Sequence, residues 1–181
     1  MKGLVFNSLA DLVEDQYGIA VWNRVINQID SAVDGAYVAS DSYAASEALA
    51  IIEALVSEVR VPVEDLLDEF GRKLFTDLYN LYPELVDSQT ALLPFMTSVG
   101  TVIHEEMKIL HRDAEVPILT YELYDRHSLT LFYQSPRKMC LLAEGLMRGA
   151  AKHYSSEIEL EHRECMHNGA KKCEFHLRII N

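Results

Sequence analysis

The sequence predicts an α+β fold in which a helical N-terminal part is followed by an antiparallel sheet with one long helix packed on it. Three observations predict this fold. Apolar residues recur every three or four positions through the first two-thirds of the 181 residues, as in amphipathic helices. Next, 116–124 and 128–133 are rich in β-branched and aromatic residues and flank a polar turn. A helix over 136–153 and two last strands, 157–162 and 173–180, complete the pattern.

The helical part is divided by residues that cap or break helices. Asp41 and Ser42 are suited to cap a long helix that begins a few residues later, and Pro62 is suited to the first turn of the next one. The chain contains no internal repeat and no low-complexity linker, so we expect a single domain over its whole length, 1–181. Within it we expect a helical subdomain over about 1–60 and a sheet-containing part over about 61–181.

A helix over about 89–111 carries a histidine on its apolar flank. His104 lies at the edge of the apolar stripe, and Gly100 lies one turn before it. Glycine costs about 1 kcal/mol of helix propensity, and room beside the histidine would offset that cost. A lone histidine on a helix flank is usually structural, so His104 is either a structural residue or a ligand. The stripe consists of Leu92, Met96, Val99, Ile103, Met107 and Leu110.

The composition indicates which class of partner the protein binds and in which cellular compartment it resides. The chain has 16 Lys and Arg against 28 Asp and Glu, a formal net charge of −12. This charge argues against nucleic acid or an anionic membrane as the main partner and favours a protein with a basic docking surface. Polar residues interrupt the apolar start at Asn7, Ser8 and Asp11, so we expect no signal peptide, no membrane span and a cytoplasmic protein. The three cysteines then bind metal or are simply buried.

The segment YQSPR, residues 133–137, places three polar side chains at two-residue spacing where a strand passes into a helix. Ser135 as a helix cap and Pro136 in the first turn explain two residues by ordinary helix-start chemistry. They do not explain Arg137, because the helix dipole disfavours a cation there. With Tyr133 on the same side, the segment would offer hydroxyls and a guanidinium fork to a carboxylate. It is therefore either a helix start alone or an anion-binding cradle.

A second cluster of chemically active residues lies near the C-terminus. His162, Cys165 and Cys173 follow one another at short spacing, and Cys140 on the preceding helix could join them. Thiolate and imidazole groups are ligands that zinc favours, and four protein ligands would close the site as a structural one. His167 could replace His162, and three buried thiols without a metal are the alternative.

With these residues in view, the chain resembles the H-NOX family, the haem nitric oxide/oxygen-binding domains related to soluble guanylate cyclase. That family carries Tyr-x-Ser-x-Arg, present here as Tyr133, Ser135 and Arg137, and an axial histidine about thirty residues upstream, which falls on His104. A proline that presses on the haem falls on Pro117. The opening MKGLVF and the glycine at position 71 also fit, and the resemblance covers essentially the whole chain.

The resemblance implies haem b as the cofactor. His104 would be the axial ligand of the iron, and Tyr133, Ser135 and Arg137 would hold the propionates. Pro117 would pack against the porphyrin. Cysteine-bearing bacterial relatives within the family also support zinc at the C-terminal cluster, as a second and structural metal.

The resemblance further implies an apolar distal pocket. Oxygen-binding members of the family have a distal tyrosine that donates a hydrogen bond to O2. That position is Leu142 here, and two supporting polar positions fall on Leu9 and Leu74. With Val5, these residues would line the distal pocket. Bound O2 gains from a donor, whereas NO on ferrous iron needs none, so NO, and also CO, should be preferred over O2.

The function implied by the resemblance is that of a stand-alone haem sensor of nitric oxide, not an enzyme. The sequence offers no evident nucleophile with a base, no paired carboxylates and no phosphate-binding loop. Binding of NO to the ferrous iron would break the bond to His104, and the resulting conformational change would regulate a partner. Stand-alone relatives act on a sensor histidine kinase or a cyclic-di-GMP enzyme.

Two other hypotheses stay open. The ending CMHNGAKKCEFHL, residues 165–177, also resembles 4-vinyl-reductase-type domains, in which zinc and an apolar cavity would bind a small molecule without haem. That interpretation gives His104 and Arg137 no role. A peroxidase-type haem enzyme is the other hypothesis, but the sequence offers no distal acid–base pair for it. The absorption spectrum of the reduced protein with NO, CO and O2 would separate the three.

Overall fold

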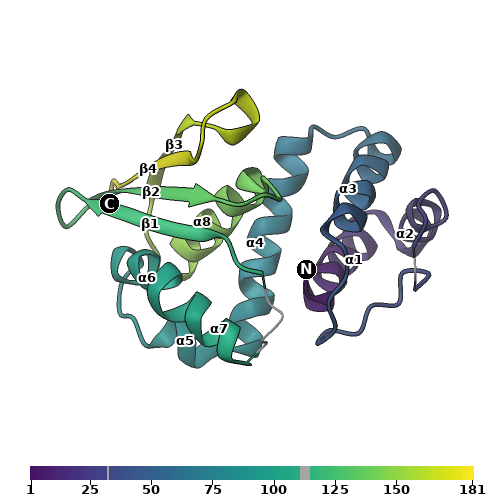
Figure 1. Cartoon of the computed structure of the whole chain (residues 1–181), viewed down its shortest axis with the longest axis horizontal. Coiled ribbons are helices and arrows are strands. Elements are labelled where there is room, and N and C mark those ends of the chain that lie inside the picture. The colour runs from purple at the N-terminus through teal and green to yellow at the C-terminus, as the bar shows by residue number, and fades with distance from the viewer. Residues whose placement is uncertain (32, 111–114) are drawn as a thin grey trace.

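The computed structural model describes residues 1–31, 33–110 and 115–181 and confirms the α+β fold, with helices first and a four-stranded sheet after them (Figure 1). The helices of the first part are α1 (Gly3–Tyr17), α2 (Ile19–Ile26), α3 (Ala45–Val59), α4 (Val63–Leu81), α5 (Pro83–Asp87), α6 (Leu92–Ser98) and α7 (His104–Leu110). They are followed by β1 (Ile118–Leu123), β2 (Ser128–Gln134), α8 (Cys140–His153), β3 (Ile158–Glu164) and β4 (Cys173–Ile179). None of the helices in the described ranges is both long and apolar enough to cross a membrane.

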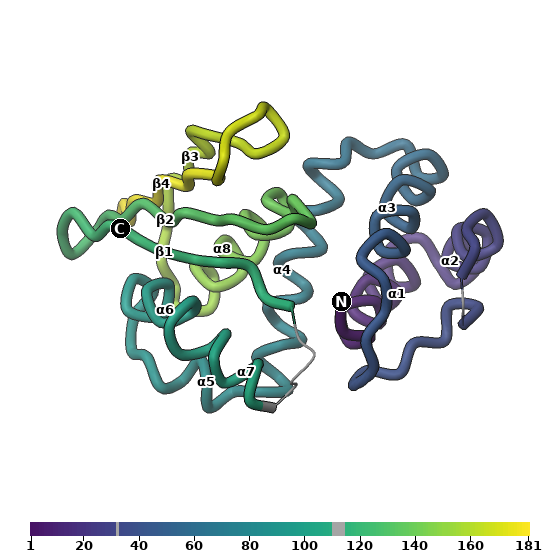
Figure 2. Tube along the Cα trace, in the orientation of Figure 1, coloured from purple at the N-terminus to yellow at the C-terminus, as the bar shows by residue number. Residues whose placement is uncertain are grey.

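In space, α4 separates two groups of elements. Figure 1 shows α1, α2 and α3 together on one side of α4, with the sheet, α8 and the α5–α7 region on the other side. The tube in Figure 2 follows the same path and ends beside the turn that joins β1 to β2. Along the sequence, the helical part therefore comes first and the part that contains the sheet follows.

The helices begin and end only partly at the capping and breaking residues that the sequence suggested. α1 stops at Gly18, whose φ of 85° is easy for glycine. α3 begins after Ala44 without a side-chain cap, so the expectation that Asp41 and Ser42 cap this helix was wrong. Pro62 stands at the cap position of α4, one residue before its first turn.

The long helix expected over 89–111 is divided by a π-helical turn, Val99–Ile103, that separates α6 from α7. Residues 111–114 lie outside the described part of the chain. A β-carbon on Gly100 would lie 2.6 Å from the carbonyl oxygen of Leu119. The missing side chain therefore makes room for β1, and the expectation that it leaves space beside the histidine was wrong. π-turns are rare and are frequent at functional sites.

The helix expected from Pro136 begins four residues later, at Cys140. Ser135 is therefore not its cap. The Oγ of Ser135 accepts the Arg137 N–H at 3.2 Å, and its carbonyl accepts the Lys138 N–H at 3.1 Å, so Ser135 begins a tight turn. Because Arg137 lies in this turn and not in the helix, the dipole argument against a cation at that position does not apply.

The sheet has the order β1-β2-β4-β3, and all neighbouring strands are antiparallel. β2 lies inside the sheet and is buried from Ser128 to Tyr133, whereas β1 is a largely exposed edge. Tyr133 pairs with Leu119 on β1 and with Cys173 on β4. This register brings the polar segment after β2 next to the cysteine at the start of β4.

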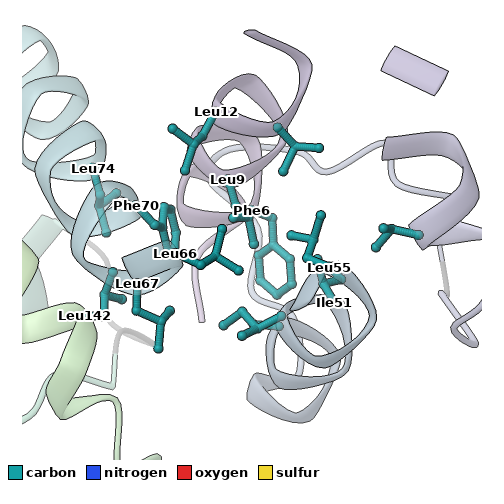
Figure 3. Packing of buried hydrophobic residues seen from close by; sticks show 14 of the residues in the cluster. Phe6, Leu9, Leu12, Ile51, Leu55, Leu66, Leu67, Phe70, Leu74 and Leu142 are labelled. Carbon is teal, nitrogen blue, oxygen red and sulfur yellow. The ribbon is translucent and has the colours of Figure 1, made fainter. Parts of the chain in front are cut away.

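The first of two hydrophobic cores joins α1, α2, α3 and α4. Figure 3 shows Phe6 of α1 at its centre, with Leu66 and Phe70 of α4 on one side and Ile51 and Leu55 of α3 on the other. All five side chains are almost completely buried. Burial of each such side chain contributes about 1.5–3 kcal/mol.

The second core fills the space between the sheet and the helices α6 and α8. Leu129, Phe175 and Leu177 of the two inner strands are completely buried in it. α8 belongs to both cores, because its residue Leu142 packs in the first and Met147 in the second. α4 does the same, so these two helices connect the two parts of the chain.

The connecting helices meet at two glycines. A β-carbon on Gly71 of α4 would lie 2.6 Å from the carbonyl oxygen of Leu142, and one on Gly145 of α8 would lie 2.5 Å from that of Asp68. Atoms do not approach so closely without displacement of the backbone. The two helices can therefore pack this tightly only because both positions lack side chains.

Replacing Gly145 with alanine should lower the free energy of unfolding. Overpacking a close contact costs about 1–3 kcal/mol, and the atoms that the new methyl group would strike belong to the backbone of Asp68 and Gly71. The measurement is the midpoint of urea or thermal unfolding. Lys152→Ala, on the exposed side of the same helix, is the matched control and should leave the midpoint unchanged. Equal midpoints for Gly145→Ala and wild type would contradict this close packing.

Candidate functional site

A cavity of about 340 Å³ opens where the two cores meet, and its wall is mostly apolar. It receives side chains from α1, α4, α6, α7, β1, β2 and α8, and from the segment before β1. Leu9 and Ser135 are not among its lining residues. The predicted site residues that line the cavity are Val5, Leu74, His104, Pro117, Tyr133, Arg137 and Leu142.

His104 is the first residue of α7 and directly follows the π-helical turn. Its Nδ1 is buried and has no hydrogen-bond partner in the described part of the chain. Burial lowers the pKa of His104 to about 4. The backbone of Pro117 offsets part of this lowering, although it makes no hydrogen bond of normal geometry to Nδ1. The imidazole is therefore neutral at pH 7 and has a lone pair available for a metal.

Tyr133 and Arg137 bring polar groups to the same cavity. The Oη of Tyr133 accepts the Met139 N–H at 3.1 Å, and burial raises the pKa of Tyr133, so the phenol stays protonated and can donate. Arg137 donates from Nη2 to the carbonyl of Glu115. A guanidinium has five N–H groups, so Arg137 can hold an anion in addition. Ser135 fixes the turn that carries Arg137.

The predicted distal residues that line the cavity come from three helices and pack in or against the first core: Val5 of α1, Leu74 of α4 and Leu142 of α8. Leu9, one helical turn after Val5, lies in the first core and is 1% exposed (Figure 3). Its absence from the cavity wall corrects the expectation that it lines the pocket. The helix-face pattern alone could not distinguish the two positions, because both belong to the buried side of α1.

Several cavity residues were missed by sequence analysis although a signal was present. Leu78 and Tyr82 follow Leu74 at four-residue spacing along and just beyond α4, and Leu146 follows Leu142 in the same way on α8. Residues four apart share one side of a helix. The family resemblance placed Leu74 and Leu142 at the pocket, and this helical spacing would have extended the lining from them to Leu78, Tyr82 and Leu146.

The C-terminal cluster is also assembled by the fold. One ligand atom from each of Cys140, His162, Cys165 and Cys173 lies within 4.8 Å of all the others. The Sγ atoms of Cys140 and Cys165 are 3.8 Å apart, which is about the spacing of two thiolates on a tetrahedral zinc with bonds of about 2.3 Å. The Met166 N–H donates to Cys173 Sγ at 3.2 Å.

The structure distinguishes the two candidate histidines of this cluster. His162 Nδ1 lies 2.8 Å from Glu144 Oε1, and its Nε2 is buried without a partner in the described part of the chain. His167 is exposed, and its Nε2 contacts the carbonyl of Lys138 at 2.8 Å. The imidazole that belongs to the cluster is therefore that of His162.

The three thiols of the cluster suit a cation. Burial raises the pKa of Cys140, and the nearby thiols of Cys173 and Cys165 raise it further. Burial raises the pKa of Cys173 in the same way. Thiolates crowded together in a buried place repel one another, and a divalent metal ion removes that repulsion. The residues present therefore fit a metal ion of the zinc type.

Comparisons with known proteins identify the family of this chain. The Haem-NO-binding family model matches residues 2–162. The H-NOX protein of S. oneidensis in the Fe(II)NO ligation state is 34% identical, with 100% of both chains covered and a TM-score of 0.94. Its H-NOX domain in the Fe(II)CO state, solved by NMR, is 34% identical, with 100% and 99% of the chains covered and a TM-score of 0.90.

The unliganded Fe(II) H-NOX protein of K. algicida is 29% identical to this chain, with 100% and 97% of the chains covered and a TM-score of 0.91. Comparison with curated proteins gave no match. The family match ends at His162, so Cys165 and Cys173 of the metal cluster lie beyond it. The match nevertheless includes His104 and the whole segment 133–137. The chain belongs to the Haem-NO-binding family, the H-NOX domains that act as haem-based gas sensors.

Proposed function

We propose that this chain is a non-catalytic haem sensor of nitric oxide. The observation that carries the proposal is His104, a neutral imidazole at the wall of an apolar cavity, with a buried nitrogen that has no partner among the described residues. A buried polar atom without a partner lowers folding stability by about 1–3 kcal/mol. Such atoms are therefore rare in packed cores, and a metal-binding site is one place where they occur. Tyr133 and Arg137 add a hydroxyl and a cation to the same cavity, as the carboxylates of haem b would require.

Each residue of the cavity then has a separate role. His104 would hold the iron through an imidazole nitrogen, and Pro117 would pack against the macrocycle. Tyr133 and Arg137 would hold the propionates, with Ser135 keeping the turn of Arg137 in place. When bound, haem b supplies a ferrous iron that takes NO or CO. S. oneidensis relatives solved in the Fe(II)NO and Fe(II)CO states support these two ligands.

Selectivity between gases would arise from the wall formed by Val5, Leu74 and Leu142. These side chains line the cavity and have no hydrogen-bond donor. Bound O2 is stabilised by a donor and NO is not. The wall therefore favours NO and CO over O2.

The response to NO would begin at His104. While the imidazole is held, α7 is tethered to the cavity, and the π-helical turn before it is pressed against Leu119 of β1 through Gly100. Release of His104 would leave α7 free to shift relative to the sheet, which gives two states with different surfaces. A sensor histidine kinase or a cyclic-di-GMP enzyme that distinguishes these states would read the signal. The net charge of −12 suits a partner with a basic docking surface.

We further propose one structural zinc ion on Cys140, His162, Cys165 and Cys173. It would join the start of α8 to the hairpin of β3 and β4, because these four residues belong to those three elements or to their ends. The haem-free alternative of the 4-vinyl-reductase type would retain this zinc but leave His104 and Arg137 without a role. The absorption spectrum of the purified ferrous protein tests the choice, since only the haem protein has a Soret band that responds to NO.

The axial ligand can be tested by substitution. His104→Ala should reduce haem content or leave a ferrous spectrum without axial imidazole, because no other described imidazole lines the cavity. The measurements are haem per chain and the ferrous Soret band. His127→Ala, in the exposed turn after β1, is the matched control and should behave as wild type. An unchanged ferrous spectrum in His104→Ala would remove the ligand assignment.

Gas selectivity can be tested at Leu142. Leu142→Tyr adds a hydroxyl to the apolar wall, and a hydrogen bond to a partly charged acceptor in a dry pocket contributes about 1.5–3 kcal/mol, or about 10- to 150-fold in affinity. O2 affinity should rise and O2 dissociation should slow, whereas NO binding should change much less. Leu142→Phe adds the ring without the hydroxyl and should not raise O2 affinity. A wild-type protein that holds O2 firmly in air would contradict the proposed selectivity.

The zinc proposal predicts one zinc per chain in metal analysis. Cys173→Ala should lower the zinc content and the unfolding midpoint of the C-terminal hairpin, because one of four ligands is lost. His167→Ala is the matched control and should keep its zinc, since His167 lies outside the cluster. Stoichiometric zinc in a variant lacking any two of the four ligands would disprove the site.

A further inference from the structure

A chain of polar contacts runs from the cysteine cluster to α4. His162 Nδ1 lies 2.8 Å from Oε1 of Glu144 on α8, and Oε2 of Glu144 accepts from Arg148 Nη1 at 3.3 Å. Arg148 Nη1 also donates to Oδ1 of Asp68 on α4 at 2.9 Å. The other carboxylate oxygen of Asp68 accepts from Arg72 Nε at 2.7 Å. Acidic and basic side chains alternate along this series of contacts, so each contact joins groups that attract one another.

We propose that Glu144 is the positioning residue of the metal at the cysteine cluster, and that Arg148 and Asp68 couple metal binding to the contact between α4 and α8. The proposal rests on the zinc site proposed above. It assigns a role to three residues that take no part in the haem cavity. Such second contacts of a metal-binding histidine commonly decide its orientation and its affinity for the metal.

Glu144 determines which nitrogen of His162 faces the cluster. An ionised carboxylate can only accept, so the hydrogen of the imidazole lies on Nδ1 and the lone pair lies on Nε2. Nε2 is buried and has no partner within residues 1–31, 33–110 and 115–181, and it is therefore the atom available to the metal. The side chains of Glu144 and His162 are only 14% and 15% exposed, so water competes little for this hydrogen bond. By contrast, Glu159 and Arg178 of the same sheet form an ion pair with both side chains more than half exposed.

Arg148 makes the connection to the other helix because a single nitrogen, Nη1, contacts both carboxylates. The backbone carbonyl of Asp68 lies against Gly145, where a β-carbon would be 2.5 Å away. The carboxylate and the backbone of Asp68 thus meet α8 within one helical turn. An arrangement of Glu144 that is fixed by the metal therefore favours the closely packed helices, and by linkage the packed helices favour metal binding.

The first experiment measures zinc affinity of the full chain by competition with a chromophoric chelator. Glu144→Gln keeps the size of the side chain but removes the carboxylate, so zinc affinity should fall by about 10- to 100-fold. The visible absorption bands of the Co²⁺-substituted protein should shift, because the imidazole is no longer held. Glu161→Gln is the matched control: Glu161 is next to His162 but is 62% exposed and faces Arg163. Its affinity and Co²⁺ bands should match wild type.

The second experiment tests the coupling to α4 with Asp68→Asn, alone and combined with Glu144→Gln. Asp68→Asn should lower zinc affinity on the order of 2- to 10-fold, and this effect should disappear in the double variant, because the path to the metal is already interrupted. Asp65→Asn, on the exposed side of the same helix, should have no effect. Because Asp68 does not touch the cluster, this variant also gives an answer if Glu144→Gln fails to fold.

The outcomes separate this inference from the zinc site on which it rests. A wild-type protein that binds neither zinc nor Co²⁺ would remove the site itself. A wild-type protein that binds zinc, together with a Glu144→Gln variant of equal affinity and unchanged Co²⁺ bands, would overturn the role of Glu144. Zinc affinity unaffected by Asp68→Asn, or lowered equally in both backgrounds, would overturn the coupling to α4.

Discussion

The close approach of α4 and α8 is the constraint on which the rest of the molecule depends. At Gly71 and Gly145 each helix occupies the space that a side chain of the other would need. Because both helices belong to both cores, their contact decides how the helical part sits against the sheet part. It also brings Leu74 and Leu142 to one cavity wall. The same contact allows an ion pair to cross between the helices, so cavity and metal cluster share one support.

Two buried imidazole nitrogens without partners mark the two sites. Within the described part of the chain, the buried side-chain nitrogen and oxygen atoms that lack a partner are His104 Nδ1 and His162 Nε2. Each costs about 1–3 kcal/mol in a core that has nothing to offer it. One lies at the apolar cavity and the other beside three thiols. The proposed haem and metal sites account for both unsatisfied nitrogens.

Features that depend on local spacing could be predicted from the sequence, and features that depend on distant segments could not. The strands follow from runs of β-branched and aromatic residues beside a polar turn, and the ligand cluster follows from its short spacings. Helix-capping preferences predicted that Ser135 caps the following helix. In the structure its hydroxyl and carbonyl instead accept hydrogen bonds within the next turn, and α8 begins only at Cys140. Position 100 has room only for a glycine, because β1 passes beside it. Glu144 reaches His162 only because α8 packs on β3, which no sequence pattern reveals.

The cavity and the cysteine cluster are neighbours in the fold. Their shared elements determine which helices can move when the cavity changes. Tyr133 of the cavity pairs with Cys173 of the cluster across β2 and β4, and Cys140 opens α8 just after the turn that carries Arg137. A metal ion held by the cluster would fix the start of α8 to the sheet. The sheet and α8 would then form a rigid reference. A change at His104 would therefore be expressed in α7, which can shift relative to this reference.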